Sequence, residues 1–174
     1  MSADGDRTRV VVVAYDSSWP RVFAGVEAEI RARFGATARD VLHIGSTAVP
    51  GLAAKPIVDV ALLVDDSAVE APYLDALSAL GYRLVVREPE WYEHRMFNRD
   101  DPAVNLHVFS VDCEEVDRVV CFRDWLRTHT DDRELYAATK RELAAQEWQH
   151  VQDYADAKGA VVEQILRRAR AATA

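Results

Sequence analysis

The chain has 174 residues and is 49% hydrophobic, which suffices for one sizeable core and is too little for two independent ones without a clear linker. Its formal net charge of −8 opposes general affinity for a polyanion such as duplex DNA, because that affinity depends on lysine and arginine displacing counterions. We therefore expect no nucleic-acid partner, while a local basic pocket for a small phosphate-containing ligand is compatible with this charge.

The chain carries no signal for secretion or for a membrane. The first nine residues, MSADGDRTR, are polar, and no apolar run approaches the roughly 20 residues of a membrane span. Two cysteines, Cys113 and Cys121, provide neither a disulfide framework nor a paired-cysteine zinc pattern. We expect a cytoplasmic protein with no membrane partner, and the sequence gives no indication of its oligomeric state.

A strand and an amphipathic helix are the first predicted elements. Residues 9–15, RVVVVAY, form a continuous β-branched run that is typical of a short buried strand. In the following DSSWP, Ser17 or Ser18 can cap a helix, and Pro20 suits its first turn. Large apolar residues then recur every three or four positions, which predicts a helix that packs on the core and ends near Gly35.

Two further strands and a helix follow. The segments DVLHIG (40–45) and KPIVDVALLV (55–64) are predicted strands, and the second is too apolar to have a solvent-facing side, so we place it centrally in its sheet. Residues 67–80 show a helical pattern that Gly81 closes.

The second half of the chain changes from strands to helices. YRLVV (82–86) predicts a strand, and HRMFN (94–98) and AVNLHVFS (103–110) predict a hairpin across RDDP. The region from Cys113 to the end is rich in alanine, glutamate, arginine and leucine, which predicts two or three helices. We expect one α/β (α+β) domain, with an α/β lobe at 1–112 and a helical lobe at 113–174.

The turn HIGSTAVPGL contains the first candidate site. It is not a Walker loop, because no lysine directly follows its second glycine. Gly45 would let the backbone approach an anion, Ser46 supplies a hydroxyl, and the amides that begin at Thr47 offer donors. Asp59 on the next strand could hold a magnesium ion that bridges phosphate oxygens. Alternatively, Gly-Ser merely turns the chain, and the aspartate is a hydrogen-bonded core group.

Four further polar residues are candidates for the same site. In a regular strand His43 would project to the same side as Gly45, unless it is a packed core histidine. Lys55, at a strand entrance, could neutralise phosphate or simply be exposed. Arg95 is the preferred guanidinium for phosphate, because its planar fork can bind oxygens in pairs. His107 lies on the polar side of its predicted strand.

The helical region adds candidates at helical spacing. Arg123 and Arg127 lie one turn apart and could reach one anion, although nearby aspartates favour a solvated ion-pair face. Lys140 and Lys158 each follow a tyrosine by four residues. We treat both lysines as candidate ligand contacts from the second lobe, with packing and solubility as the alternative.

Six segments, in chain order, resemble the GrpB family over almost the whole chain: YDSSWPRVF, HIGSTAVPGLAAKPIVDV, EHRMF, NLHVFS, FRDWLR and YADAKGAVVEQIL. Members of this family are similar to the nucleotidyltransferase superfamily, which includes DNA polymerase beta. The resemblance implies a nucleotidyltransferase-like mixed sheet with flanking helices and a helical C-terminal region. In some bacterial relatives a GrpB-like domain is fused to dephospho-CoA kinase.

The same resemblance implies roles for individual residues. Gly45 and Ser46 match the pair that grips a nucleotide triphosphate, and Asp59 matches the first metal-binding acid. The second acid is missing, because position 61 is Ala61, and the strand expected to carry the third acid presents His107 instead. Asp59 and His107 would then be the ligands of a magnesium or manganese ion.

Three functions follow from these patterns. The first is binding of a nucleotide or another phosphate-containing ligand, with possible metal-dependent nucleotidyl transfer to a small acceptor, for which Asp59, His107 and Arg95 would be catalytic. The second is a non-catalytic nucleotide-binding or CoA-related module that has lost the second and third acids. The third is a hydrolase or transferase that holds zinc or manganese with His43, Asp59 and His107.

Overall fold

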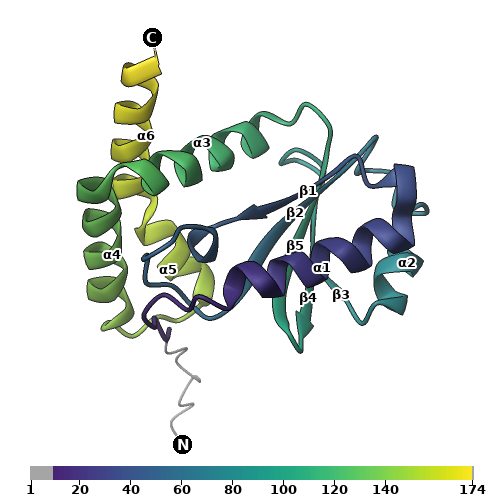
Figure 1. The fold of residues 1–174 in the computed structure, drawn as a ribbon, viewed down its shortest axis with the longest axis horizontal. Helices are drawn as coiled ribbons and strands as arrows, with labels where there is room; N and C mark the ends of the chain where they lie inside the picture. The colour runs from purple at the N-terminus through teal and green to yellow at the C-terminus, as the bar shows by residue number, and fades with distance from the viewer. Residues whose placement is uncertain (1–9, 174) are drawn as a thin grey trace, which may run out of the picture.

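The computed structural model describes residues 10–173, whose centre is a five-stranded mixed sheet (Figure 1). The strands are β1 (Asp40–Ile44), β2 (Val58–Val64), β3 (Arg83–Glu88), β4 (His94–Asp100) and β5 (Ala103–Ser110). They lie in the order β1-β2-β5-β4-β3, with β2 and β5 parallel and the other neighbours antiparallel. The apolar β2 is therefore an interior strand, as its sequence predicts.

Helices cover both faces of this sheet. They are α1 (Trp19–Phe34), α2 (Leu74–Ala79), α3 (Glu114–Thr128), α4 (Thr130–Ala144), α5 (Val151–Ala157) and α6 (Gly159–Thr173). In Figure 1, α1 crosses the front of the sheet with α2 at its right end, while α3–α6 gather above and to the left. None of the helices among the described residues combines the length and the apolar character that crossing a membrane would require.

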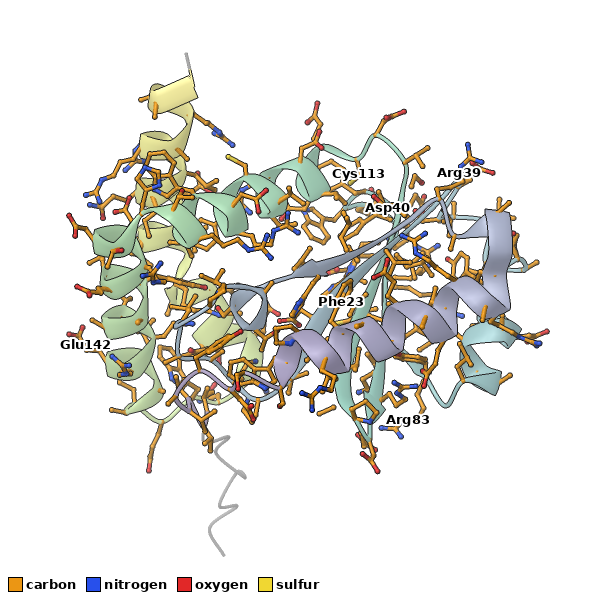
Figure 2. All side chains as sticks on the ribbon, viewed as in Figure 1. Phe23, Arg39, Asp40, Arg83, Cys113 and Glu142 are labelled. Atoms are coloured by element: carbon orange, nitrogen blue, oxygen red, sulfur yellow. The ribbon has the colours of Figure 1, made fainter. Side chains whose placement is uncertain are left out.

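Two hydrophobic clusters hold these layers together, and side chains fill the space between them (Figure 2). In the first, Val26 and Ile30 of α1 pack on Val60 and Leu62 of β2. The second cluster joins the loop before β2 to three of the C-terminal helices, and it contains Val49, Leu52, Leu126, Tyr136, Ala137, Val161 and Ile165. Because apolar burial drives this packing, the second cluster fixes the loop against the helices.

The predicted mixed α/β fold and its hairpin are confirmed. β4 and β5 pair antiparallel up to Asp100 and Ala103, so the turn falls at the predicted RDDP. α1 begins at Trp19 with Pro20 in its first turn, but the Ser18 side chain caps no amide. Instead, Asp16 Oδ1 accepts a hydrogen bond from the Ser18 amide at 2.7 Å.

Residues 10–15 do not form the predicted buried strand; Arg9 and the rest of the N-terminal tip lie outside the described residues. Val13 makes an isolated bridge to Ala54, and Val11 is 58% exposed. Ala54 belongs to the loop before β2, so this segment meets one loop residue and no strand edge along which a ladder could continue.

The helix boundaries also differ from the prediction. In the predicted helix 67–80 only α2 is α-helical, because Pro72 disfavours the α conformation of the residue before it. The C-terminal region forms four helices among the described residues, where two or three were expected. His129 lies between α3 and α4 in an extended conformation, which separates the two helices.

Candidate functional site

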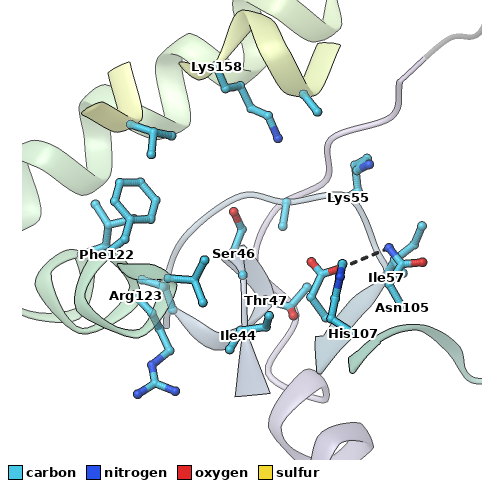
Figure 3. A pocket seen from close by; sticks show the side chains of 18 of the residues that line it. Ile44, Ser46, Thr47, Lys55, Ile57, Asn105, His107, Phe122, Arg123 and Lys158 are labelled. Atoms are coloured by element: carbon cyan, nitrogen blue, oxygen red, sulfur yellow. Dashed lines mark hydrogen bonds and ion pairs between the residues drawn. The ribbon is translucent and has the colours of Figure 1, made fainter. Parts of the chain in front are cut away.

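A pocket of about 390 Å³ lies between the sheet and helices α3–α6 (Figure 3). Asp59 of β2 is aligned with Asn105 of the parallel strand β5, and His107 and Phe109 follow at two-residue intervals. Side chains alternate between the two faces of a strand, so these four point to the same face. The helices contribute residues that include Arg123, Tyr136, Lys140, Tyr154 and Lys158.

The Gly45 turn brings the end of β1 to this pocket. Gly45 has a φ of +70°, a conformation that favours glycine. A Cβ atom at this position would lie 2.6 Å from Asp59 Oδ2, so the absence of a side chain also lets the aspartate approach the backbone. The 3-10 turn Ser46–Ala48 follows directly, and the Ser46 side chain lines the pocket.

Three lysines, Lys55, Lys140 and Lys158, line the pocket around Ser46. Lys140 Nζ donates to Ser46 Oγ at 2.9 Å and also to the carbonyl oxygen of Ala53. In Figure 3 the Lys158 ammonium and the Ser46 hydroxyl point into the pocket from opposite sides.

Burial and neighbouring positive charges lower the pKa values of two of these lysines. Burial, together with the charges of Lys158 and Arg141, lowers the pKa of Lys140 to about 7. Burial and the charge of Lys55 lower the pKa of Lys158 to about 8. An anion placed among these ammonium groups would favour their charged forms and reverse both shifts.

Asp59 is the acidic residue whose charge acts on both Lys140 and Lys158. Asn105 Nδ2 donates to Asp59 Oδ1 at 3.1 Å, and His107 Nε2 lies 3.8 Å from the same oxygen. Burial raises the pKa of Asp59, but His107, Asn105 and Lys55 lower it by more, so the net shift is downward. The carboxylate is therefore ionised at neutral pH.

The structure brings most of the predicted site residues together. Those that line the pocket are Gly45, Ser46, Thr47, Lys55, Asp59, His107, Arg123 and Lys140. The Arg123 guanidinium has partners outside the centre of the pocket. Its Nη1 donates to the carbonyl oxygen of His43 at 2.9 Å, and its Nε pairs with Asp124 at 2.8 Å. In Figure 3 its guanidinium points away from the centre of the pocket.

The prediction that Arg95 faces the phosphate is wrong. Arg95 pairs with Val108 across β4 and β5, whereas His107 pairs with Met96, so Arg95 and His107 lie on opposite faces of the sheet. The buried Arg95 side chain forms an ion pair with Glu70 at 2.7 Å and another with Glu93 at 3.2 Å. Strand alternation fixes this outcome once the register of the hairpin is known.

His43 also lies on the face opposite the pocket. It is aligned with Val60, it stacks on Phe23 of α1 at 4.8 Å between ring centroids, and Nε2 is 3.0 Å from Thr47 Oγ1. Burial and the nearby Arg127 charge lower its pKa to about 4, so the ring is neutral at pH 7. His43 is thus a packed core histidine, the alternative that its sequence position left open.

The donor set does not fit a metal centre that the protein holds by itself. Within residues 10–173 no group of three or more histidine, cysteine, aspartate or glutamate side chains is placed to hold a metal ion. Ala61 is buried beside His107, where a second acid was sought, and His43 faces away. The hypothesis of a His43, Asp59 and His107 metal site is therefore wrong, and two-metal transfer lacks the carboxylates that it needs.

The sequence patterns do not single out several residues that line the pocket. Asn105 precedes His107 by two residues, so the strand period that selected the histidine also indicates the asparagine. The tyrosine spacing makes Lys158 a candidate, but no sequence pattern shows that the chain folds back over Ser46 at this residue. Trp91 reaches the pocket from the loop between β3 and β4, and no pattern in the sequence predicts this.

Comparisons with known proteins agree with one another. Residues 9–168 of this chain match the sequence model of the family described as GrpB protein. A UPF0157 protein of Halalkalibacterium halodurans is 49% identical over 162 residues, which cover 93% of this chain and 83% of that protein. A UPF0157 protein of Streptomyces coelicolor is 46% identical over 158 residues, which cover 91% of this chain and 83% of that protein.

Solved structures share the fold. The crystal structure of the conserved protein GrpB from Enterococcus faecalis is similar, with a TM-score of 0.77 and 26% identity, over 91% of this chain and 96% of that chain. The structure of the GLD-2/RNP-8 complex gives a TM-score of 0.53 at 10% identity, over 74% of this chain and 54% of that chain. The second likeness concerns the fold alone.

Proposed function

The chain belongs to the GrpB family, and from this premise we propose that it binds a small phosphate-containing ligand of the nucleotide class in the pocket between the sheet and α3–α6. The observation that carries the proposal is the hydrogen bond between Lys140 and Ser46, in a pocket that two more lysines line. This local excess of positive charge occurs in a chain with a net charge of −8.

The phosphate would lie among Ser46 and the three lysines. Asp59 is the carboxylate that acts on both Lys140 and Lys158, and it opposes the lowering of both pKa values. Glu115, the other carboxylate that lines the pocket, pairs with Arg118 at 3.1 Å, so Asp59 leaves the positive charge of the three lysines incompletely balanced, which a phosphate group would correct. Ser46 Oγ and the amides of the 3-10 turn would add hydrogen-bond donors.

The remainder of the pocket favours a ligand larger than phosphate. A volume of about 390 Å³ is within the usual range for small-molecule sites. Trp91 and the buried Phe109 line it, with 5.9 Å between their ring centroids, and Trp91, which is 41% exposed, offers apolar surface to a base or a similar ring. A nucleotide combines these two requirements.

Binding, rather than nucleotidyl transfer, is the function that the donor set favours. Transfer by two metals needs several carboxylates close together, whereas the pocket offers Asp59 with Ala61 and His107 at the other positions. The proposal therefore corresponds to a module that keeps a phosphate cradle without the second and third acids.

Calorimetric titration tests the proposal. The probes are ATP, AMP, coenzyme A and inorganic phosphate, each with and without magnesium, against the native chain and Lys140→Met. We expect nucleotide binding that persists without magnesium and weakens at least tenfold in the variant. The matched control is Arg141→Met, which removes the same charge from the exposed neighbour on α4.

Two results would contradict the proposal. One is the absence of binding for all four probes at millimolar concentration. The other is an equal effect of Lys140→Met and Arg141→Met, which would reduce the role of Lys140 to a general contribution of charge.

A further inference from the structure

A continuous chain of polar contacts crosses the sheet from the surface to the pocket. Glu88 Oε2 of β3 lies 2.7 Å from His94 Nδ1, and His94 Nε2 of β4 lies 2.9 Å from His107 Nδ1 of β5. The next contact, from His107 Nε2 to Asp59 Oδ1 of β2, is 3.8 Å long. Four neighbouring strands thus contribute one residue each.

The direction of each hydrogen bond in this series of contacts follows from Glu88, where the series begins. The Glu88 side chain is 47% exposed, and an ionised carboxylate accepts hydrogen bonds only, so His94 donates through Nδ1–H. A neutral His94 then has a lone pair on Nε2, which must accept the hydrogen bond from His107 Nδ1–H. The other ring nitrogen of His107, Nε2, is left with its lone pair in the pocket.

The 3.8 Å contact agrees with these directions. With a neutral His107 that is protonated at Nδ1, Nε2 and the Asp59 carboxylate are both acceptors, and two acceptors do not approach to hydrogen-bond distance. In this arrangement only an imidazolium at His107 would donate to Asp59 and lower its pKa. Asp59 Oδ1 instead receives its hydrogen bond from Asn105 Nδ2. The sheet side of the pocket therefore presents two neighbouring acceptors, while the lysine side presents donors.

We infer that Glu88 and His94 are positioning residues that fix the His107 tautomer, so that this part of the pocket selects a ligand with a hydroxyl group. The hydroxyl would donate to His107 Nε2 while the lysines hold the phosphate. This inference rests on the proposed function and narrows its ligand to a hydroxyl-bearing phosphate compound, such as a nucleotide with an intact ribose.

The tautomer is measured by nitrogen-15 NMR on histidine-labelled protein, with His107→Gln to assign the signals. We expect the Nδ1–H form of His107 to dominate in the native chain. In Glu88→Leu, His94 can reverse its orientation of donor and acceptor, so the Nε2–H form of His107 should become the majority. Glu90→Leu removes an exposed carboxylate from the turn after β3 and should leave the native tautomer unchanged.

The ligand preference is measured with ATP and its 2′,3′-dideoxy analogue. We expect the native chain to bind ATP roughly 3- to 10-fold more tightly, the usual value of one hydrogen bond, and Glu88→Leu to lose this preference. A dominant Nε2–H form in the native chain, or a tautomer insensitive to Glu88→Leu, overturns the positioning role. Equal affinity for the two nucleotides overturns the hydroxyl preference, whereas binding of neither overturns the proposed function and the ligand class with it.

Discussion

Lys140 Nζ on α4 donates a hydrogen bond to Ser46 Oγ at 2.9 Å, although 94 positions separate the two residues in the sequence. The contact closes the pocket between the Gly45 turn and the helices. It is possible because the second hydrophobic cluster fixes the loop that contains Leu52 against α3, α4 and α6. The same packing buries the lysine, whose side chain then has few partners for its charge.

The lowered lysine pKa values predict that nucleotide binding takes up protons. With pKa values of about 7 and 8, Lys140 is mostly neutral at pH 8 and Lys158 is about half protonated. A bound anion favours the charged forms and so raises both values. We therefore expect each bound nucleotide to take up about one proton at pH 8. Because binding takes up protons, the affinity should fall as the pH rises from 7 to 9.

Calorimetry of ATP binding in Tris and in HEPES measures this uptake, because the two buffers differ in the heat of releasing a proton. Lys140→Met should reduce the uptake, and Arg141→Met should reduce it by less, because the Arg141 charge accounts for only part of the lowering of the Lys140 pKa. Heats that are the same in both buffers would show that no proton is exchanged and that neither lysine changes its charge state.

Gly45→Ala is predicted to destabilise the fold by more than a typical substitution of a glycine with positive φ. The left-handed conformation alone costs roughly 1–3 kcal/mol for alanine, and the added Cβ would also lie 2.6 Å from Asp59 Oδ2. Gly51→Ala is the matched control, since Gly51 has a φ of +79° and no atom within 4 Å of the added Cβ. Urea unfolding should show the greater loss at position 45, and equal losses would mean that the aspartate moves aside at no cost.

Leu126→Ala is predicted to lower the free energy of unfolding by about 2–5 kcal/mol, the usual cost of removing a large buried side chain. Leu126 is 1% exposed and belongs to the second hydrophobic cluster. Leu135→Ala, at a position that is 37% exposed, should change stability by about 0.5 kcal/mol or less. Thermal and urea unfolding measure both. A small effect at Leu126 would contradict the importance of this cluster for fixing the loop.

Arg95→Met is predicted to reduce stability without reducing nucleotide affinity. Removing one partner from a buried ion pair costs roughly 3–5 kcal/mol, because it leaves Glu70 with less compensation. Arg87→Met removes another partner of Glu70 whose side chain is 55% exposed, so its cost should be smaller. Unfolding and ATP titration, both at a temperature where the variants stay folded, separate the two roles. A large loss of affinity in folded Arg95→Met would restore Arg95 to the phosphate site.

Local patterns in the sequence were sufficient for most secondary structure in the sheet. β2 is recognisable because its apolar run has no polar side, and the β4–β5 hairpin because RDDP separates two strand-like segments. These features depend on neighbouring residues only. The isolated bridge at Val13 was not predictable in this way, because a β-branched segment becomes a strand only where a partner edge is available.

The sequence by itself determined that Gly45, Ser46, Asp59 and His107 belong to strands and a turn that could form one site. Strand alternation divides residues into two faces, but it does not say which face meets which helices. The tertiary structure decided that Asp59, Asn105 and His107 face α3–α6, while His43 and Arg95 face α1 and α2. It also brought Lys140 and Lys158 to Ser46, because burial of distant apolar residues, and no local pattern, sets how the helices fold back over the sheet.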